Sequence, residues 1–166
     1  MVIPATVNPR TLSSQNSRIE GMVPRKSLLR LNEAVCKLSR DASAEIYFKI
    51  SEESSYELSG MVEIEAEVIC QRCLEKCQIK LSSTFSFVIV ECEEKEQQLR
   101  STRDVWVVVG RTGDLYSLLE DELLMALPPV SYHKNTACNP ELIKHYQQSL
   151  NDAHSPFNIL KNIDFY

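Results

Sequence analysis

The stretch MVEIEAEVIC, residues 61–70, decides the fold. Apolar residues alternate in it with three glutamates, a period of two that is typical of a strand with one buried face and one wet face. After the short connection CQRCLEKC, residues 70–77, a second strand is predicted over residues 78–90. Because strands joined by so short a segment pair antiparallel, the sequence predicts a β-hairpin here.

Two shorter strands are predicted on either side of this hairpin in the sequence. Residues 44–51 form one of them. Residues 104–109 form the other, and because they are β-branched and apolar we expect a central strand. The charged residues 91–103 are predicted to form a loop between the hairpin and this last strand.

Helical patterns occur in three places. Over residues 27–39 apolar residues recur at helical spacing, with Ser27 as a candidate N-cap. A second helix is predicted from Thr112 or Asp114 to Leu127, where a double proline ends it because proline lacks the backbone amide. A third begins at Asn139-Pro140 and runs to about residue 150.

These elements predict an α+β fold, with an antiparallel sheet of about four or more strands and helices on one side or at the ends. A length of 166 residues fits a single domain over residues 1–166. Residues 1–24 contain three prolines and are predicted to be an irregular basic arm. Residues 151–166 are predicted to form a C-terminal tail.

The net charge of -5 is unevenly distributed. Residues 1–40 hold seven basic and two acidic side chains, a net +5, and the remaining residues carry -10. An acidic body argues against wrapping of nucleic acid by the whole protein, and the basic arm is the candidate for phosphate contacts. The candidate RNA-binding residues are Arg18, Arg25, Lys26 and Arg30.

The N-terminus has no apolar signal region and no apolar run is long enough to cross a bilayer, so we expect a cytoplasmic protein. In that compartment the six cysteines are expected to be thiols, metal ligands or core residues rather than disulfides. Cys36 lies beside the apolar stripe of the first helix and is expected in the core.

Four side chains are candidate metal ligands. Cys70 and Cys73 form a C-x-x-C turn between two strands, where both thiolates can bind one soft cation such as zinc. His133 and Cys138 lie in a second loop and could complete a tetrahedral set. The alternatives are a redox pair and a turn without bound metal, and Cys77 is a rival ligand.

The consecutive acidic residues Glu120, Asp121 and Glu122 lie on the predicted second helix. Neighbouring helical residues project about 100° apart, so these carboxylates cannot converge on one substrate. We expect them on an exposed face or on a docking face for a basic partner. The sequence has no phosphate-binding glycine loop and no G-x-S-x-G motif, which leaves little support for an enzyme.

The order of motifs resembles one bacterial family. A basic N-terminal region and a helix precede CQRC, followed by LLEDELLMALPPVSYH (residues 118–133), a further cysteine and SPFNIL (residues 155–160). This order resembles the YceD family, the large ribosomal RNA subunit accumulation proteins, over nearly the whole chain. The positions that match the family pattern are Cys70, Arg72, Cys73, Glu120, Asp121, Glu122, Leu127, Pro128, His133, Cys138, Pro156 and Phe157. Two departures are Ser155, where asparagine is expected, and the extra thiol of Cys77.

The resemblance implies a non-enzymatic role in the synthesis, processing or stability of large-subunit ribosomal RNA. The implied partner is that RNA or its precursor particle, reached directly or through a ribosomal or assembly protein. Two alternatives remain, a small thiol- or metal-dependent RNA-processing enzyme and a protein-binding adaptor without RNA contact. An adaptor would dock through the acidic helix residues or through Pro156 and Phe157.

Overall fold

The computed structural model describes residues 1–52, 54–92, 102–135, 137–141 and 144. Its centre is an antiparallel hairpin of two long strands, β5 (Tyr56–Ile69) and β6 (Lys76–Val90). β4 (Ala42–Ile50) pairs antiparallel with β5, and β2 (Arg18–Val23) pairs antiparallel with β4. The predicted α+β fold and the predicted hairpin are therefore confirmed.

The alternation in β5 sets its two faces. Val62, Ile64, Ala66 and Val68 are all buried, while the glutamates between them are only partly covered. Lysines on β6 pair with two of these glutamates, Lys80 with Glu63 at 2.6 Å and Lys76 with Glu67 at 2.9 Å. The wet face of the hairpin is thus a ladder of cross-strand ion pairs, and the other face carries the core.

The strand predicted over residues 104–109 is shorter than expected and lies at the edge of the sheet. Observed as β7 (Val105–Val107), it pairs parallel with the end of β6 and ends the strand order β2-β4-β5-β6-β7. The expectation of a central strand was wrong because the apolar character of this segment reflects local packing. Trp106 is buried against Gly113, where an added Cβ would lie 2.5 Å from the indole ring.

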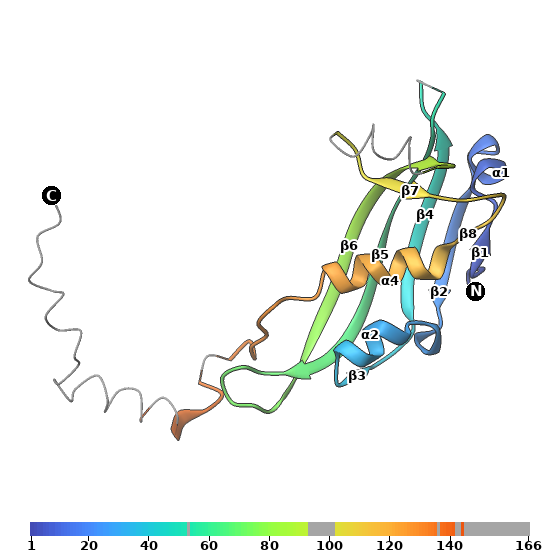
Figure 1. Cartoon of the computed structure of the whole chain (residues 1–166). Helices are drawn as coiled ribbons and strands as arrows, with labels where there is room; N and C mark the ends of the chain where they lie inside the picture. Colours follow the sequence, from blue (N-terminus) through green and yellow to red (C-terminus); the bar gives the residue numbers. More distant parts are fainter. Residues whose placement is uncertain (53, 93–101, 136, 142–143, 145–166) are drawn as a thin grey trace, which may run out of the picture.

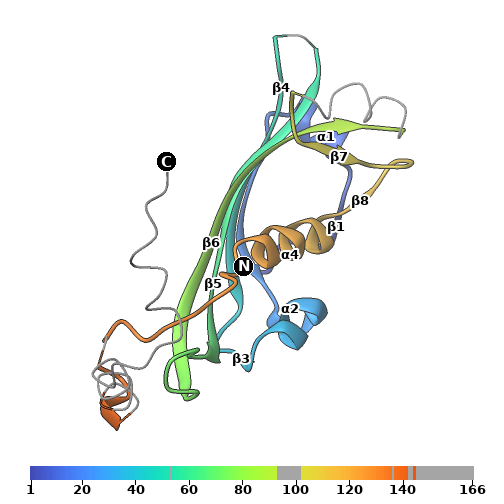
Figure 2. The ribbon, with the colours of Figure 1, turned by 60° about the vertical axis from the view of Figure 1, so that its left-hand side comes forward.

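The helices α2 (Leu29–Ala34) and α4 (Leu115–Met125) lie on the concave side of the curved sheet (Figure 1 and Figure 2). α4 begins at Asp114, whose side chain accepts a hydrogen bond from the Ser117 amide at 3.0 Å, as predicted for a cap. Its residues Leu115, Leu119 and Leu123 are fully buried. The double proline follows the helix as predicted, so the chain leaves the core at that point.

α2 (Leu29–Ala34) is much shorter than the helix predicted over residues 27–39. A 3-10 turn, η1 (Arg25–Ser27), precedes it, and the short strand β3 (Lys37–Leu38) follows it. The backbone amides of Cys36 and Ser39 donate to carbonyls of β5, so pairing with the sheet edge replaces the last helical turns. Cys36 is exposed, which corrects its expected place in the core.

Residues 1–24 are more regular than predicted. They form β1 (Thr6–Val7), α1 (Pro9–Ser14) and β2, and β1 pairs with β8 (Gly113–Asp114). The sequence signal was present, because Asn8 caps α1 and Pro9 occupies its first position, the usual place for proline in a helix. None of the helices in the described part of the chain is long and apolar enough to cross a membrane.

Three sequence predictions lie wholly or largely outside the described residues. They are the loop over residues 91–103, the helix after Asn139 and the tail with Pro156 and Phe157.

Candidate metal centre

The turn between β5 and β6 has the geometry of a knuckle that presents two thiols. The Cys70 amide donates to the Glu75 carbonyl at 2.8 Å, and the Leu74 amide donates to the Cys70 carbonyl at 2.9 Å. Leu74 has a φ of 61°, the left-handed conformation that lets the chain reverse within a few residues. Cys70 is fully buried and Cys73 is half-buried on this turn.

The segment after α4 runs along this knuckle. The Gln71 amide donates to the Ser131 carbonyl at 2.9 Å. Nε2 of His133 lies 3.1 Å from the Lys76 carbonyl oxygen. These two contacts bring residues 131–133 beside a turn that precedes them by about sixty positions.

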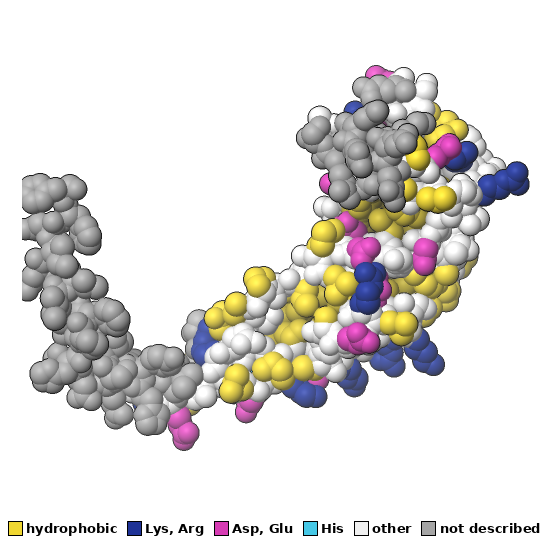
Figure 3. Space-filling model, in the orientation of Figure 1, with side chains coloured by type: hydrophobic (Ala, Val, Ile, Leu, Met, Phe, Trp, Pro, Cys, Tyr) yellow, Lys and Arg dark blue, Asp and Glu magenta, His cyan; other side chains and the backbone are white. Residues whose placement is uncertain are grey.

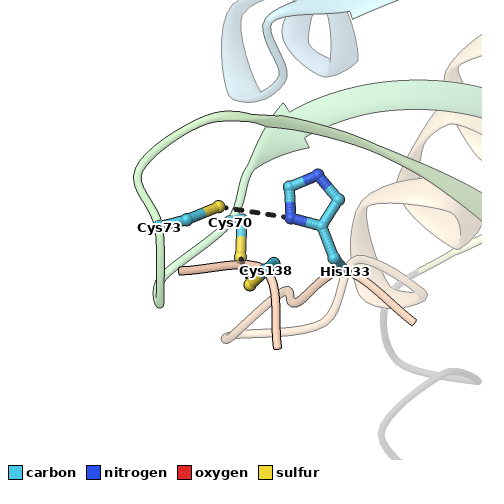
Figure 4. Close-up of side chains that lie close together, drawn as sticks. All are labelled: Cys70, Cys73, His133 and Cys138. Atoms are coloured by element: carbon cyan, nitrogen blue, oxygen red, sulfur yellow. Dashed lines mark hydrogen bonds between the residues drawn. The ribbon is translucent and has the colours of Figure 1, made fainter. Parts of the chain in front are cut away.

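The structure brings the four predicted ligands together (Figure 4). One donor atom from each of Cys70, Cys73, His133 and Cys138 lies within 4.8 Å of the other three. Cys73 Sγ is 3.2 Å from His133 Nδ1, and Cys70 Sγ is 4.0 Å from Cys138 Sγ. A tetrahedral zinc ion with Zn–S of about 2.3 Å would hold two sulfurs about 3.8 Å apart, so the set is close to the required size.

Hydrogen bonds orient the His133 ring and place the Arg72 guanidinium at the Cys138 sulfur. A carbonyl next to Nε2 requires that nitrogen to carry the proton, which leaves the lone pair of Nδ1 directed at the cluster. Arg72 Nη1 donates to Cys138 Sγ at 3.6 Å and to the Asn135 carbonyl at 3.2 Å. Three thiolates around a divalent ion leave a charge of about −1, which the Arg72 guanidinium would offset.

The knuckle also sets the charge of its thiols. Burial acts to raise the pKa of Cys70, but the amides of Cys73, Arg72 and His133 and the Cys73 thiol donate to its sulfur and lower the pKa to about 5. Burial raises the pKa of Cys73 to about 11, with Cys70 and Cys138 adding to the rise. The knuckle thus lowers the pKa of one thiol and raises that of its neighbour, so the pair favours a single negative charge. A bound cation would favour deprotonation of Cys73 as well.

Cys77 is not one of the clustered donors among the described residues, although it is buried beside them against Val68 and Cys70. Burial raises its pKa, with the neighbouring thiols contributing. Its role here is that of a small apolar side chain.

The set is better suited to a structural metal than to a thiol nucleophile. A Cys–His pair is present, but two further sulfurs converge on the same point. Four protein donors fill a tetrahedral coordination sphere and leave no position for a substrate or water.

The acidic block on α4 is not an exposed face. Glu120 and Glu122 are each only 6% exposed. Glu120 accepts from the Leu31 amide at 3.1 Å and from Arg30 Nε at 2.9 Å, and Glu122 accepts from the Ser83 hydroxyl at 2.6 Å. The sequence interpretation missed this because a neighbouring element, not the helix itself, supplies the partners.

Glu120 caps the N-terminus of α2. The N-cap residue of that helix is Leu28, which has no side-chain acceptor. The carboxylate of Glu120 satisfies a first-turn amide in its place. Asp121, half-exposed, pairs with Arg30 Nη1 at 2.6 Å and reinforces the contact between α2 and α4.

The four residues predicted to bind RNA do not form an irregular arm. Arg18 lies on β2 and pairs with Glu20 and Glu45, and Arg30 is engaged by the acidic block. Arg25 donates to the Leu38 carbonyl at 3.0 Å, and Lys26 is exposed beside it. Basic side chains do gather over α2 and β3, along the lower edge in Figure 3.

Comparison with known proteins identifies relatives of the whole chain. The family model described as "Large ribosomal RNA subunit accumulation protein YceD" matches residues 58–164, which include both segments of the cluster and the acidic block. A protein of that same name from Haemophilus influenzae is 26% identical over 167 aligned positions, covering 97% of this chain and 95% of the relative. No solved structure matches the chain. The protein belongs to the YceD family.

Proposed function

We propose that the protein is a non-enzymatic, cytoplasmic factor required for the accumulation of large-subunit ribosomal RNA, through its synthesis, processing or stability. The observation that carries this proposal is the family match over residues 58–164. The full-length alignment with the Haemophilus influenzae relative supports it, because that protein carries the same name. The partner is the RNA itself or its precursor particle.

We further propose that the cluster of Cys70, Cys73, His133 and Cys138 binds one zinc ion in a structural role. Three cysteines and a histidine favour zinc among the common divalent ions, since thiolate and imidazole are softer ligands than carboxylate. In this role the ion would fix the knuckle to the segment after α4. The chemistry of the factor would then be recognition and not bond cleavage.

Deletion of the gene tests the proposed role. We expect a lower ratio of large-subunit to small-subunit rRNA, restored by the wild-type gene. Complementation with Cys70→Ser should fail, whereas Cys36→Ser, which changes an exposed thiol outside the cluster, should restore the ratio. Unchanged rRNA ratios and ribosomal subunit profiles in the deletion strain would refute the proposed function.

A further inference from the structure

A groove of about 790 Å³ lies between the lower part of β6 and the segment that carries the metal ligands. Pro128, Tyr132 and Lys134 line one side. Gln78, Ile79 and Lys80 of β6 line the other. Ser39 and Glu65 complete the lining, so the groove combines apolar surface with polar groups, two lysines and one glutamate.

Tyr132 is an aromatic platform at this groove. Tyr132 is 52% exposed, and the Arg72 guanidinium lies 5.0 Å from the centroid of its ring. Arg72 is itself held by the Asn135 carbonyl and by Cys138 Sγ. The ring is therefore fixed through a cation–π contact to the cluster while half of its surface stays open to a ligand.

The position of Tyr132 and Lys134 follows from the cluster. Both are direct neighbours of His133, whose ring is fixed between Cys73 Sγ and the Lys76 carbonyl. The hydrogen bond from the Gln71 amide to the Ser131 carbonyl fixes the backbone directly before Tyr132. A ligand that used Tyr132 would meet a side chain on a constrained backbone, which reduces the entropy lost on binding.

The one charge of the groove's described lining that is left without an ion-pair partner is positive. Glu65 lines it but pairs with Arg40, and Glu63 next to it pairs with Lys80 at 2.6 Å. Within the described residues Lys134 has no ion-pair partner, so its ammonium group is available to a phosphate. Gln78 accepts from the Ser39 hydroxyl and donates to Glu67, so Tyr132 and Lys134 are the groups that a ligand would meet. An aromatic face beside a cation is the usual composition of a site for single-stranded nucleic acid.

We propose that this groove binds a single-stranded segment of RNA, with one base stacked on Tyr132 and the adjoining phosphate beside Lys134. The choice of RNA as the ligand rests on the proposed role in the accumulation of ribosomal RNA. The metal cluster supplies the rigid support for the platform, and the wet face of β6 supplies the opposite wall.

Fluorescence anisotropy with a short labelled oligouridylate tests this proposal on the purified full-length protein. Tyr132→Ala should raise Kd by roughly 5- to 150-fold, because it removes one aromatic stacking partner. Tyr132→Phe and Tyr132→Trp keep the ring and should bind as the wild type does. Lys134→Gln should lower the slope of log Kd against log salt by about 0.7, the loss of one phosphate contact on a single strand.

Tyr47 is a matched control on another part of the molecule. It is 42% exposed and has the Arg18 guanidinium 5.5 Å from its ring centroid, but it lies on β4 away from the groove. Tyr47→Ala should leave Kd unchanged. The proposal is overturned if Tyr132→Ala binds as tightly as the wild type, or if both alanine variants lose affinity equally.

A second measurement separates this proposal from the proposed function. Tyr132→Ala and Tyr47→Ala are each placed in the deletion strain, and the ratio of large- to small-subunit rRNA is measured. If the deletion lowers the ratio and the purified wild type binds no oligouridylate, the groove proposal fails and the proposed function stands. If the deletion leaves the ratio normal while Tyr132-dependent binding is present, the proposed function fails and the groove proposal stands.

Discussion

Different interactions stabilise the two ends of the molecule. In the main core, fully buried leucines of α4 pack against β5 and β6. At the knuckle end the buried cluster is small, consisting of Val68, Cys70 and Cys77 with partly buried neighbours. A buried leucine contributes about 1.5–3 kcal/mol, so apolar burial is the main source of stability in the core, whereas the knuckle buries little apolar surface.

The difference explains where the polar ligands are found. A short apolar cluster cannot fix two segments separated by about sixty residues, so the contact depends on directed interactions between Cys, His and Arg side chains. The comparison therefore predicts that damage to the core lowers global stability without affecting metal binding. Damage to the cluster should abolish metal binding, and it should lower global stability only by the free energy that the bound ion contributes.

The largest expected effect on stability is in the core. Leu119→Ala should lower the free energy of unfolding by about 2–5 kcal/mol, because it removes buried methyl groups and leaves a cavity. Chemical denaturation measures the change. The metal content of the folded variant should equal that of the wild type, and a parallel loss of metal would show that the two ends are not independent.

Glu120→Ala should have the next largest effect. It removes the hydrogen bonds to the Leu31 amide and to Arg30, and bonds of this kind to a charged group are worth about 1.5–3 kcal/mol. The control is Asp121→Asn, which weakens a half-exposed ion pair with the same arginine and should cost less than about 1 kcal/mol. Equal losses in both variants would mean that capping of α2 is not what Glu120 contributes.

Arg72→Ala should act at the cluster and on the adjoining Tyr132 ring, and leave the main core unchanged. Loss of a hydrogen bond to a ligating sulfur is expected to weaken metal binding by about 10- to 100-fold. Competition with a chromogenic chelator measures the affinity. Arg40→Ala, which alters a surface pair with Glu65 on the wet face, is the matched control and should leave the affinity unchanged. If Arg40→Ala weakened metal binding as much as Arg72→Ala, the Arg72 hydrogen bond to Cys138 would not be what supports the metal affinity.

The smallest effect is expected on the wet face of the sheet. Lys49→Ala removes an exposed lysine that pairs with Glu57 at 3.2 Å, and Glu57 keeps a second partner in Arg103 at 3.2 Å. The loss should therefore stay within the roughly 0.2–1 kcal/mol that is typical of a surface ion pair. Both the denaturation midpoint and the metal affinity should stay close to the wild-type values. A loss of stability as large as that of Leu119→Ala would contradict the view that ion pairs on this solvent-exposed face contribute little to folding.

The sequence was sufficient where one local pattern determined the structure. The alternation of β5 predicted its buried face, and Asp114 and the double proline bounded α4. It was insufficient where distant partners decided. Leu38 looked helical by spacing but is buried on a strand, because the edge of β5 offers carbonyls to the chain beside it.

The same distinction applies to the candidate site. The spacing of Cys70 and Cys73 indicated a ligand pair, and the structure brings the second pair beside it. The partners of Glu120 and the cation–π contact of Tyr132 could not be predicted, since each joins residues that are far apart in the sequence. A buried carboxylate in an apparently amphipathic helix has no distinguishing local signal.

The zinc content of the purified protein tests the central claim most directly. Elemental analysis combined with X-ray absorption should give about one zinc per chain, with three sulfurs at about 2.3 Å and one nitrogen at about 2.0 Å. Cys138→Ser should lose the ion or bind it far more weakly, and Cys36→Ser should retain it, because only the first residue belongs to the cluster. The account would be contradicted if the protein, purified under reducing conditions, contained no zinc and still bound none after incubation with zinc.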